Sequence, residues 1–304
     1  MKSFLTLMQR EWMQHRFGWS LMALVPLGLS LVLLGFGQIE LQDDSVQNAG
    51  PALSLLVAMG TMAVSTLVVF FILWITSLIL VSGLPRRDHA DRSIEFWLSL
   101  PTGHAPSLAA PLLMHLIVVP AAALVIGMVG GWVLSAVVVT RVVDLDAWFA
   151  LPWGQLLLAM AAGLVRLLVG LPLATLWLLP LILLTMLMTA WFRRWGLVVL
   201  VVALGLASLV LEQVYGSPLL REIVASLFRH AGWALVASGQ YQFTVQGPES
   251  VANVLGSLPR YVAGDLAIAF GQLLSPLLAG GLAFAGACFA LLVDWRRRGA
   301  SAVG

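Results

Sequence analysis

Long stretches without a charged side chain set the class of fold that this sequence can adopt. Residues 51–84, 107–140 and 197–211 contain no Asp, Glu, Lys or Arg. Only 10% of all residues are charged and 61% are hydrophobic, whereas about a quarter of the residues of a typical soluble domain are charged. About 20 apolar residues suffice for a helix to cross the hydrocarbon core of a bilayer. We therefore predict an all-α integral membrane protein with six transmembrane helices.

The predicted spans follow from the alternation of apolar and polar stretches. We place them at about 18–37, 51–84, 107–140, 170–191, 197–214 and 266–293. Residues 155–169 contain Arg166, and a lone arginine at mid-bilayer is costly unless it is paired or lines a cavity. We interpret this segment as an interfacial or re-entrant helix on the external side. Residues 212–265 are expected to form the longest external region, in which 219–236 is a partly buried helix.

The first seventeen residues are predicted to form an amphipathic helix in the membrane interface, not a signal peptide. Apolar residues recur there at helical spacing: Leu5, Met8 and Trp12. Polar residues occupy the other side: Gln9, Arg10, Gln14 and Arg16. The chain is thus divided into an interfacial helix at 1–17 and a six-span membrane domain at 18–304.

Basic residues predict the orientation of the spans. Of the 16 Lys and Arg residues, eleven fall on one side: Lys2, Arg10, Arg16, Arg86, Arg87, Arg92, Arg193, Arg194, Arg296, Arg297 and Arg298. The positive-inside rule makes this the cytoplasmic side. Both termini are then cytoplasmic, which agrees with an even number of spans.

Several kinds of chemistry are excluded by the residue inventory. The only lysine is Lys2, so no phosphate-binding P-loop is present and ATP hydrolysis would require another polypeptide. Cys288 is the only cysteine, so neither an internal disulfide nor a thiol cluster can form. No HExxH pair exists and no two histidines are three or four residues apart, so we predict no metal site and no catalytic residues. A net charge of +2 with scattered arginines does not indicate nucleic-acid binding.

The cytoplasmic loop at 85–106 is the most polar interior stretch, and apolar residues interrupt it. The residues of interest are Asp91, Arg92, Ile94, Glu95, Phe96, Trp97, Leu98 and Leu100. A short helix here would end at Pro101. It would either lie in the lipid headgroups or dock, through its aromatic residues, into a groove on a cytoplasmic partner.

This loop, Asp91-Arg-Ser-Ile-Glu-Phe-Trp-Leu-Ser-Leu-Pro101, resembles the loop between the second and third spans of exporter-class ABC transporter permeases. Gln9-Arg10-Glu11-Trp12 and the basic Arg296–Arg298 end are similar as well, although a glycine common near Arg92 in that family is missing. The resemblance implies a permease subunit of an ATP-driven exporter in a bacterial inner membrane. The loop would be the coupling helix, and the segment with Arg10, Glu11 and Trp12 the elbow helix beside it.

The resemblance also implies the partners. A second permease protomer, identical or a paralogue, would complete the membrane dimer, and two copies of an ATPase subunit would bind the ATP and Mg²⁺. The present chain would bind no cofactor itself. The nature of the substrate is not implied.

Alternatives from other classes remain open. The chain could be a membrane anchor subunit or an intramembrane enzyme of another complex, or a secondary transporter, although no internal repeat or mid-bilayer polar constellation favours these.

Arg166, Glu212 and Asp265 lie near predicted membrane boundaries. They are interpreted as interface anchors or an ion pair that closes the outer side, or alternatively as contacts to a substrate or gate. The Gly127–Gly131 GxxxG spacing predicts close helix packing, which we expect within the protomer in preference to a contact between two protomers.

Overall fold

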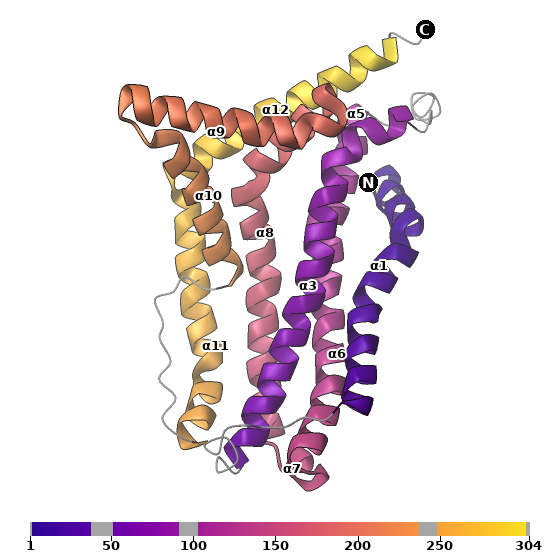
Figure 1. The fold of residues 1–304 in the computed structure, drawn as a ribbon, viewed down its shortest axis with the longest axis vertical. Helices are drawn as coiled ribbons and strands as arrows, with labels where there is room; N and C mark the ends of the chain where they lie inside the picture. The colour runs from indigo at the N-terminus through magenta and orange to yellow at the C-terminus, as the bar shows by residue number, and fades with distance from the viewer. Residues whose placement is uncertain (1, 38–50, 91–102, 237–247, 302–304) are drawn as a thin grey trace.

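Long apolar helices run side by side along most of the molecule (Figure 1). The computed structural model describes residues 2–37, 51–90, 103–236 and 248–301. Five helical segments in this part of the chain are long and apolar enough to cross a membrane: Phe4–Phe36, Leu53–Arg87, His104–Val142, Trp153–Tyr215 and Pro276–Arg298. The structure thus agrees with a helical, multi-pass membrane protein, but it divides the chain differently from the six predicted spans.

The packing of α3 (Pro51–Ala90) on α6 (Val119–Val142) is the most extensive contact between two helices of the bundle. It depends on the GxxxG glycines of α6. A Cβ atom added at Gly127 would lie 2.8 Å from the Cα of Thr66, and one added at Gly131 would lie 2.9 Å from the Cα of Met62. Only glycine permits this approach of the two backbones. The GxxxG motif therefore packs within the protomer, as predicted.

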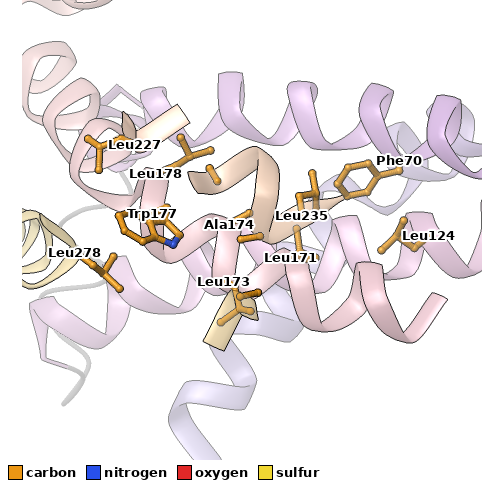
Figure 2. Close-up of a cluster of buried hydrophobic side chains, with 13 residues drawn as sticks. Phe70, Leu124, Leu171, Leu173, Ala174, Trp177, Leu178, Leu227, Leu235 and Leu278 are labelled. Carbon is orange, nitrogen blue, oxygen red and sulfur yellow. The ribbon is translucent and has the colours of Figure 1, made fainter. Parts of the chain in front are cut away.

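At the centre of the bundle, α8 (Trp153–Phe192) contacts α3, α10 (Leu219–Leu235), α11 (Pro248–Gly271) and α12 (Pro276–Ser301). Figure 2 shows the hydrophobic cluster that joins these helices around Trp177 and Ala174, with Leu235 of α10 near Ala174 and Phe70 of α3 further along, on the side of Leu124. The Trp177 side chain is fully buried and stacks on the ring of His230. This cluster fixes α8 as the axis of the fold.

The predicted division of α8 is wrong, because residues 155–169 and 170–191 belong to one continuous helix of 40 residues. The length of the apolar stretch 155–191, supported by Arg166, led to the prediction that its first part lies outside. In the structure this arginine is buried and paired with Asp265, so the helix need not leave the bundle to expose it. At 1.5 Å per residue α8 is about 60 Å long, which exceeds the hydrocarbon core of about 30 Å.

The predicted fifth span is not confirmed as a separate span, because it falls within one candidate membrane segment, Trp153–Tyr215. A short 3₁₀ turn, η2 (Arg193–Trp195), joins α8 to α9 (Gly196–Tyr215), with Arg193 in the left-handed region at φ 56°. A Cβ atom at Gly196 would lie 2.5 Å from the Cα of Thr189, so glycine is needed for this tight turn between α8 and α9. As a result α9 lies across one end of the bundle instead of running beside α8 (Figure 1). Only Gly196 and Leu200 of α9 are buried.

Residues 212–265 were predicted to be a non-spanning external region, and the partly buried helix expected at 219–236 is present as α10. Both α10 and α11 pack along α8, which the prediction did not include. The charged residues of α10 and α11 lower the mean hydropathy of these helices, so a prediction based on apolar stretches does not identify them as part of the bundle. The predicted sixth span at 266–293 is interrupted as well. A 3₁₀ turn, η3 (Gln272–Leu274), ends α11, and Ser275 is extended (ψ 136°) before Pro276 starts α12, as expected of a residue that precedes proline.

The N-terminal helix is not separate from the first span, because α1 continues from Lys2 to Phe36. Its buried face includes Leu7, Glu11 and Trp19, whereas Leu5 and Trp12 of the predicted apolar face are exposed. Further along, α1 packs against α3 and α6. The remaining described elements are α5 (His104–Leu113), the π-helix η1 (Met114–Val118), which continues into α6, and α7 (Leu145–Phe149).

The glycine contacts between α3 and α6 predict a stability effect. Gly127→Ala or Gly131→Ala should destabilise the chain by about 1–3 kcal/mol, because the added methyl group overpacks the contact with the α3 backbone. Equilibrium unfolding in mixed micelles measures this free energy. Gly60→Ala on α3 is the matched control, since nothing lies within 4 Å of a Cβ atom there. Equal stability of all three variants would contradict the packing described.

Candidate functional site

A cavity of about 400 Å³ lies between α3, α6, α8 and α11. Its lining is largely apolar and includes four methionines: Met59, Met62, Met128 and Met160. Methionine side chains are flexible and polarisable, and they adapt to ligands of different shape. Gly163 of α8 leaves part of this wall without a side chain. A mostly apolar cavity of this size with a few polar groups is typical of a small-molecule site.

The polar groups of the cavity wall include Arg166, Asp265 and Tyr261. Arg166 Nε donates a hydrogen bond of 2.7 Å to Asp265 Oδ2, and both residues are buried. A buried charge of either sign is very unfavourable alone, so each residue requires the other. This ion pair joins α8 to α11 across the cavity wall.

Arg166 also binds the end of α10. Its Nη1 and Nη2 atoms donate hydrogen bonds of 2.5 and 2.8 Å to the carbonyl oxygens of Ala234 and Trp233. The C-terminal end of a helix favours a positive charge because its last carbonyl groups lack helical partners. Gly170 makes the approach possible, since a Cβ atom at this position would collide with the Ala234 carbonyl oxygen. One guanidinium group therefore holds three helices together.

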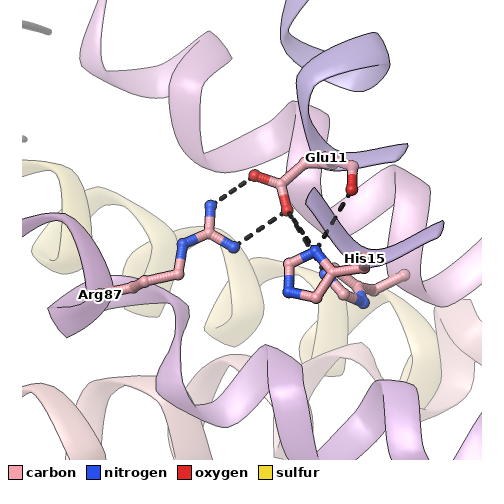
Figure 3. A network of polar contacts seen from close by, with 4 residues as sticks. Glu11, His15 and Arg87 are labelled. Carbon is pink, nitrogen blue, oxygen red and sulfur yellow. Dashed lines mark hydrogen bonds and ion pairs between the residues drawn. The ribbon is translucent and has the colours of Figure 1, made fainter. Parts of the chain in front are cut away.

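A second polar cluster lies where α1, α3 and the π-helix η1 meet (Figure 3). Glu11 is 1% exposed and accepts two hydrogen bonds from Arg87, one from Nη1 at 3.0 Å and one from Nη2. His115 Nε2 lies 3.6 Å from Glu11 Oε2, and His15 Nδ1 lies 3.8 Å from the same oxygen. The rings of Trp19, His15 and His115 pack against one another, with centroids 5.3–5.4 Å apart.

The π-helix that contains His115 has a local cause. Pro120 lies two residues after its end, in α6, and proline has no backbone N–H to donate to the carbonyl group four residues earlier. Single π-helical turns inside α-helices occur frequently at functional sites. The turn places His115, which is fully buried, against Glu11 of α1.

The predicted site residues fall in different places. The coupling residues Asp91 to Leu100 lie outside the described residues, and so does Pro101. Of the three predicted elbow residues, Glu11 is buried, Arg10 lines a small pocket with Arg87 and Arg296, and Trp12 is exposed. Arg166 lines the cavity, but Glu212 does not.

Glu212 pairs with Arg221, 2.9 Å away, and both side chains are substantially exposed. It lies near the end of α9, and α9 crosses the end of the bundle at which α1 begins (Figure 1). We expected Glu212 on the opposite, outer side. The difference follows from the transverse course of α9, which does not cross the bundle. Arg166 and Glu212 therefore do not share a site.

Sequence reasoning missed Arg87, His15 and His115 as partners of Glu11. The one available signal was the i, i+4 spacing of Glu11 and His15 on a single helix. The methionine lining was missed because its residues come from three helices distant in sequence.

No known family model matches the chain, and no curated protein or solved structure shows significant similarity to it.

The buried ion pair predicts a strong single-mutant effect. Asp265→Asn should destabilise the chain by about 3–5 kcal/mol, because it leaves the Arg166 charge buried without its partner. The double variant Arg166→Met/Asp265→Leu should recover a large part of that loss, since neither charge remains. Equilibrium unfolding of the two variants measures both effects.

The control for this cycle is the exposed pair of Glu212 and Arg221. Glu212→Gln should change stability by at most about 1 kcal/mol, because solvent screens this interaction. A similar loss for Glu212→Gln and Asp265→Asn would refute the special role of the buried pair.

Proposed function

We propose that the chain is the transmembrane permease subunit of an ATP-driven exporter, with the cavity between α3, α6, α8 and α11 as its substrate site. The observation that supports this most directly is the apolar, methionine-lined cavity of about 400 Å³ inside a membrane helix bundle. Its lining fits an apolar or amphiphilic substrate, and the Arg166–Asp265 pair offers a polar group or charge a place to bind.

ATP hydrolysis would take place in two copies of a separate ATPase subunit, because Lys2 is the only lysine and no P-loop exists in this sequence. The resemblance of the 91–101 segment to the coupling loop of exporter-class permeases gives the place of contact. This segment directly follows α3, the helix that supplies Met59, Met62 and Thr66 to the cavity wall. Movement of the loop would therefore act on the cavity through α3.

The Glu11–Arg87 ion pair connects α1 to the same end of α3. Arg87 precedes the proposed coupling segment by four residues, and Glu11 lies in the proposed elbow segment. A push from the ATPase on the loop would thus reach α1 and α3 together. Opening of the cavity between two such protomers, identical or paralogous, would release the substrate on the other side of a bacterial inner membrane.

The alternatives are a membrane anchor subunit and an intramembrane enzyme. An anchor has no need of an open cavity lined by a buried ion pair. An enzyme would require reactive groups at the cavity, whose polar lining is limited to Thr66, Arg166, Tyr261 and Asp265 among the described residues. The transport proposal accounts for the cavity and for the missing P-loop together.

A pull-down from native membranes tests the partnership. The tagged chain should co-purify with an ATP-binding-cassette subunit in equimolar amount, and Phe96→Ala/Trp97→Ala should abolish the association by removing the proposed apolar anchors. Ser99→Ala in the same segment is the control and should retain it. The proposal fails if the chain comes out alone, or if the aromatic double variant retains both the partner and full ATP-driven transport.

A further inference from the structure

We propose that Glu11, His15 and His115 form a binding site for a divalent transition-metal ion, with Zn²⁺ as its best-suited occupant. This inference goes beyond the proposed transport function and does not depend on it. The three side chains come from α1 and the π-helix η1, and their candidate ligand atoms all lie within 4.8 Å of one another. Two imidazoles and a carboxylate are a ligand set suited to zinc and to related N/O-binding metals.

The distances are close to those that a metal requires. Ligand atoms in tetrahedral zinc sites lie about 3.4 Å apart, as follows from metal–ligand bonds of about 2.0–2.1 Å. Glu11 Oε2 lies 3.6 Å from His115 Nε2 and 3.8 Å from His15 Nδ1. The distance between the two histidine nitrogens is bounded only by the 4.8 Å span of the cluster, so the His15 ring must rotate toward the other two ligands and away from the Glu11 carbonyl oxygen at 3.2 Å.

His115 provides the independent indication of a ligand. It is 0% exposed; its Nδ1 has no hydrogen-bond partner within the described part of the chain, and its Nε2 faces only Glu11 Oε2, at 3.6 Å, which is longer than a normal hydrogen bond. Burial of an unsatisfied polar group is unfavourable, so such groups usually have a function or a further partner. A metal ion between His115 Nε2 and Glu11 Oε2 would satisfy one of these nitrogens directly.

Arg87 is compatible with a metal at this position. Arg87 Nη1 also donates to Oε2, at 3.0 Å. A carboxylate has two oxygens and about four lone-pair sites, so Glu11 Oε2 can bind a metal through its second lone pair while Oε1 still accepts from Arg87 Nη2. Carboxylate ligands in metal sites are commonly held by such outer hydrogen bonds, which orient them. Three protein ligands leave the fourth tetrahedral position for water or another small ligand.

Metal uptake by the detergent-purified full-length chain tests this proposal. After treatment with a chelator, the chain is dialysed against Zn²⁺ and its metal content is measured, and Co²⁺ is titrated as a spectroscopic probe of tetrahedral coordination. We expect one Zn²⁺ per chain and the visible absorption of tetrahedral Co²⁺. His115→Ala and Glu11→Gln should weaken Zn²⁺ binding by about 100-fold or more, since loss of even an outer-shell partner costs about 10–100-fold.

Two further variants keep the result interpretable. His15→Ala removes a ligand that is 21% exposed, so it tests the site even if replacement of the buried His115 prevents folding. His104→Ala is the matched control for adventitious binding by a histidine near the same end of the bundle, and it should bind Zn²⁺ as the parent does. No Zn²⁺ uptake by the parent, or equal uptake by His15→Ala and His104→Ala, would overturn the proposal.

Discussion

The buried pair of Arg166 and Asp265 is the interaction on which the arrangement of the membrane helices depends. Each charge alone would be very unfavourable in a low-dielectric interior, so the two residues must meet. Arg166 also binds the final carbonyl groups of α10, and thus α8, α10 and α11 are joined at one point. The same pair lines the cavity between these helices and α3. A ligand bound in this cavity would therefore contact the charged pair.

The helical membrane class could be predicted from the sequence, because uncharged runs such as 51–84 leave no other stable solution in a bilayer. The GxxxG spacing of Gly127 and Gly131 was informative as well, because two glycines on one face of a helix indicate that another helix backbone packs closely there. The course of α8 was not predictable. Arg166 appears as an isolated charge in sequence, and its partner Asp265 is 99 residues away. The transverse course of α9 could not be predicted either, because an apolar helix has the same sequence pattern whether it runs parallel to the bundle or perpendicular to it at one end.

The two polar sites are connected through α3. At one end of this helix Arg87 holds Glu11 of α1, and further along Met59, Met62 and Thr66 form part of the cavity wall. The α3 backbone packs directly on Gly127 and Gly131, so it cannot shift without moving α6. Packed helices transmit such displacements because their contacts have discrete arrangements. Under the proposed function, this packing would transmit a displacement at the end of α3 to the cavity. The sequence could not reveal this connection, because each of its contacts joins residues that are distant in sequence.

The central claim, that ATP hydrolysis by a partner rearranges the cavity, is tested most directly by cysteine accessibility. Cys288 is the only cysteine and is buried, so Cys288→Ala provides a background free of thiols. Gly163→Cys places a thiol at the cavity, and Gly154→Cys places one on the same helix outside it; neither added Cβ atom meets a neighbour within 4 Å. The rate of modification by a small thiol reagent is then measured in vesicles with the ATPase subunit, with and without ATP. The account predicts that ATP changes the rate at position 163 and leaves position 154 unaffected, whereas an unchanged rate at 163 would contradict it.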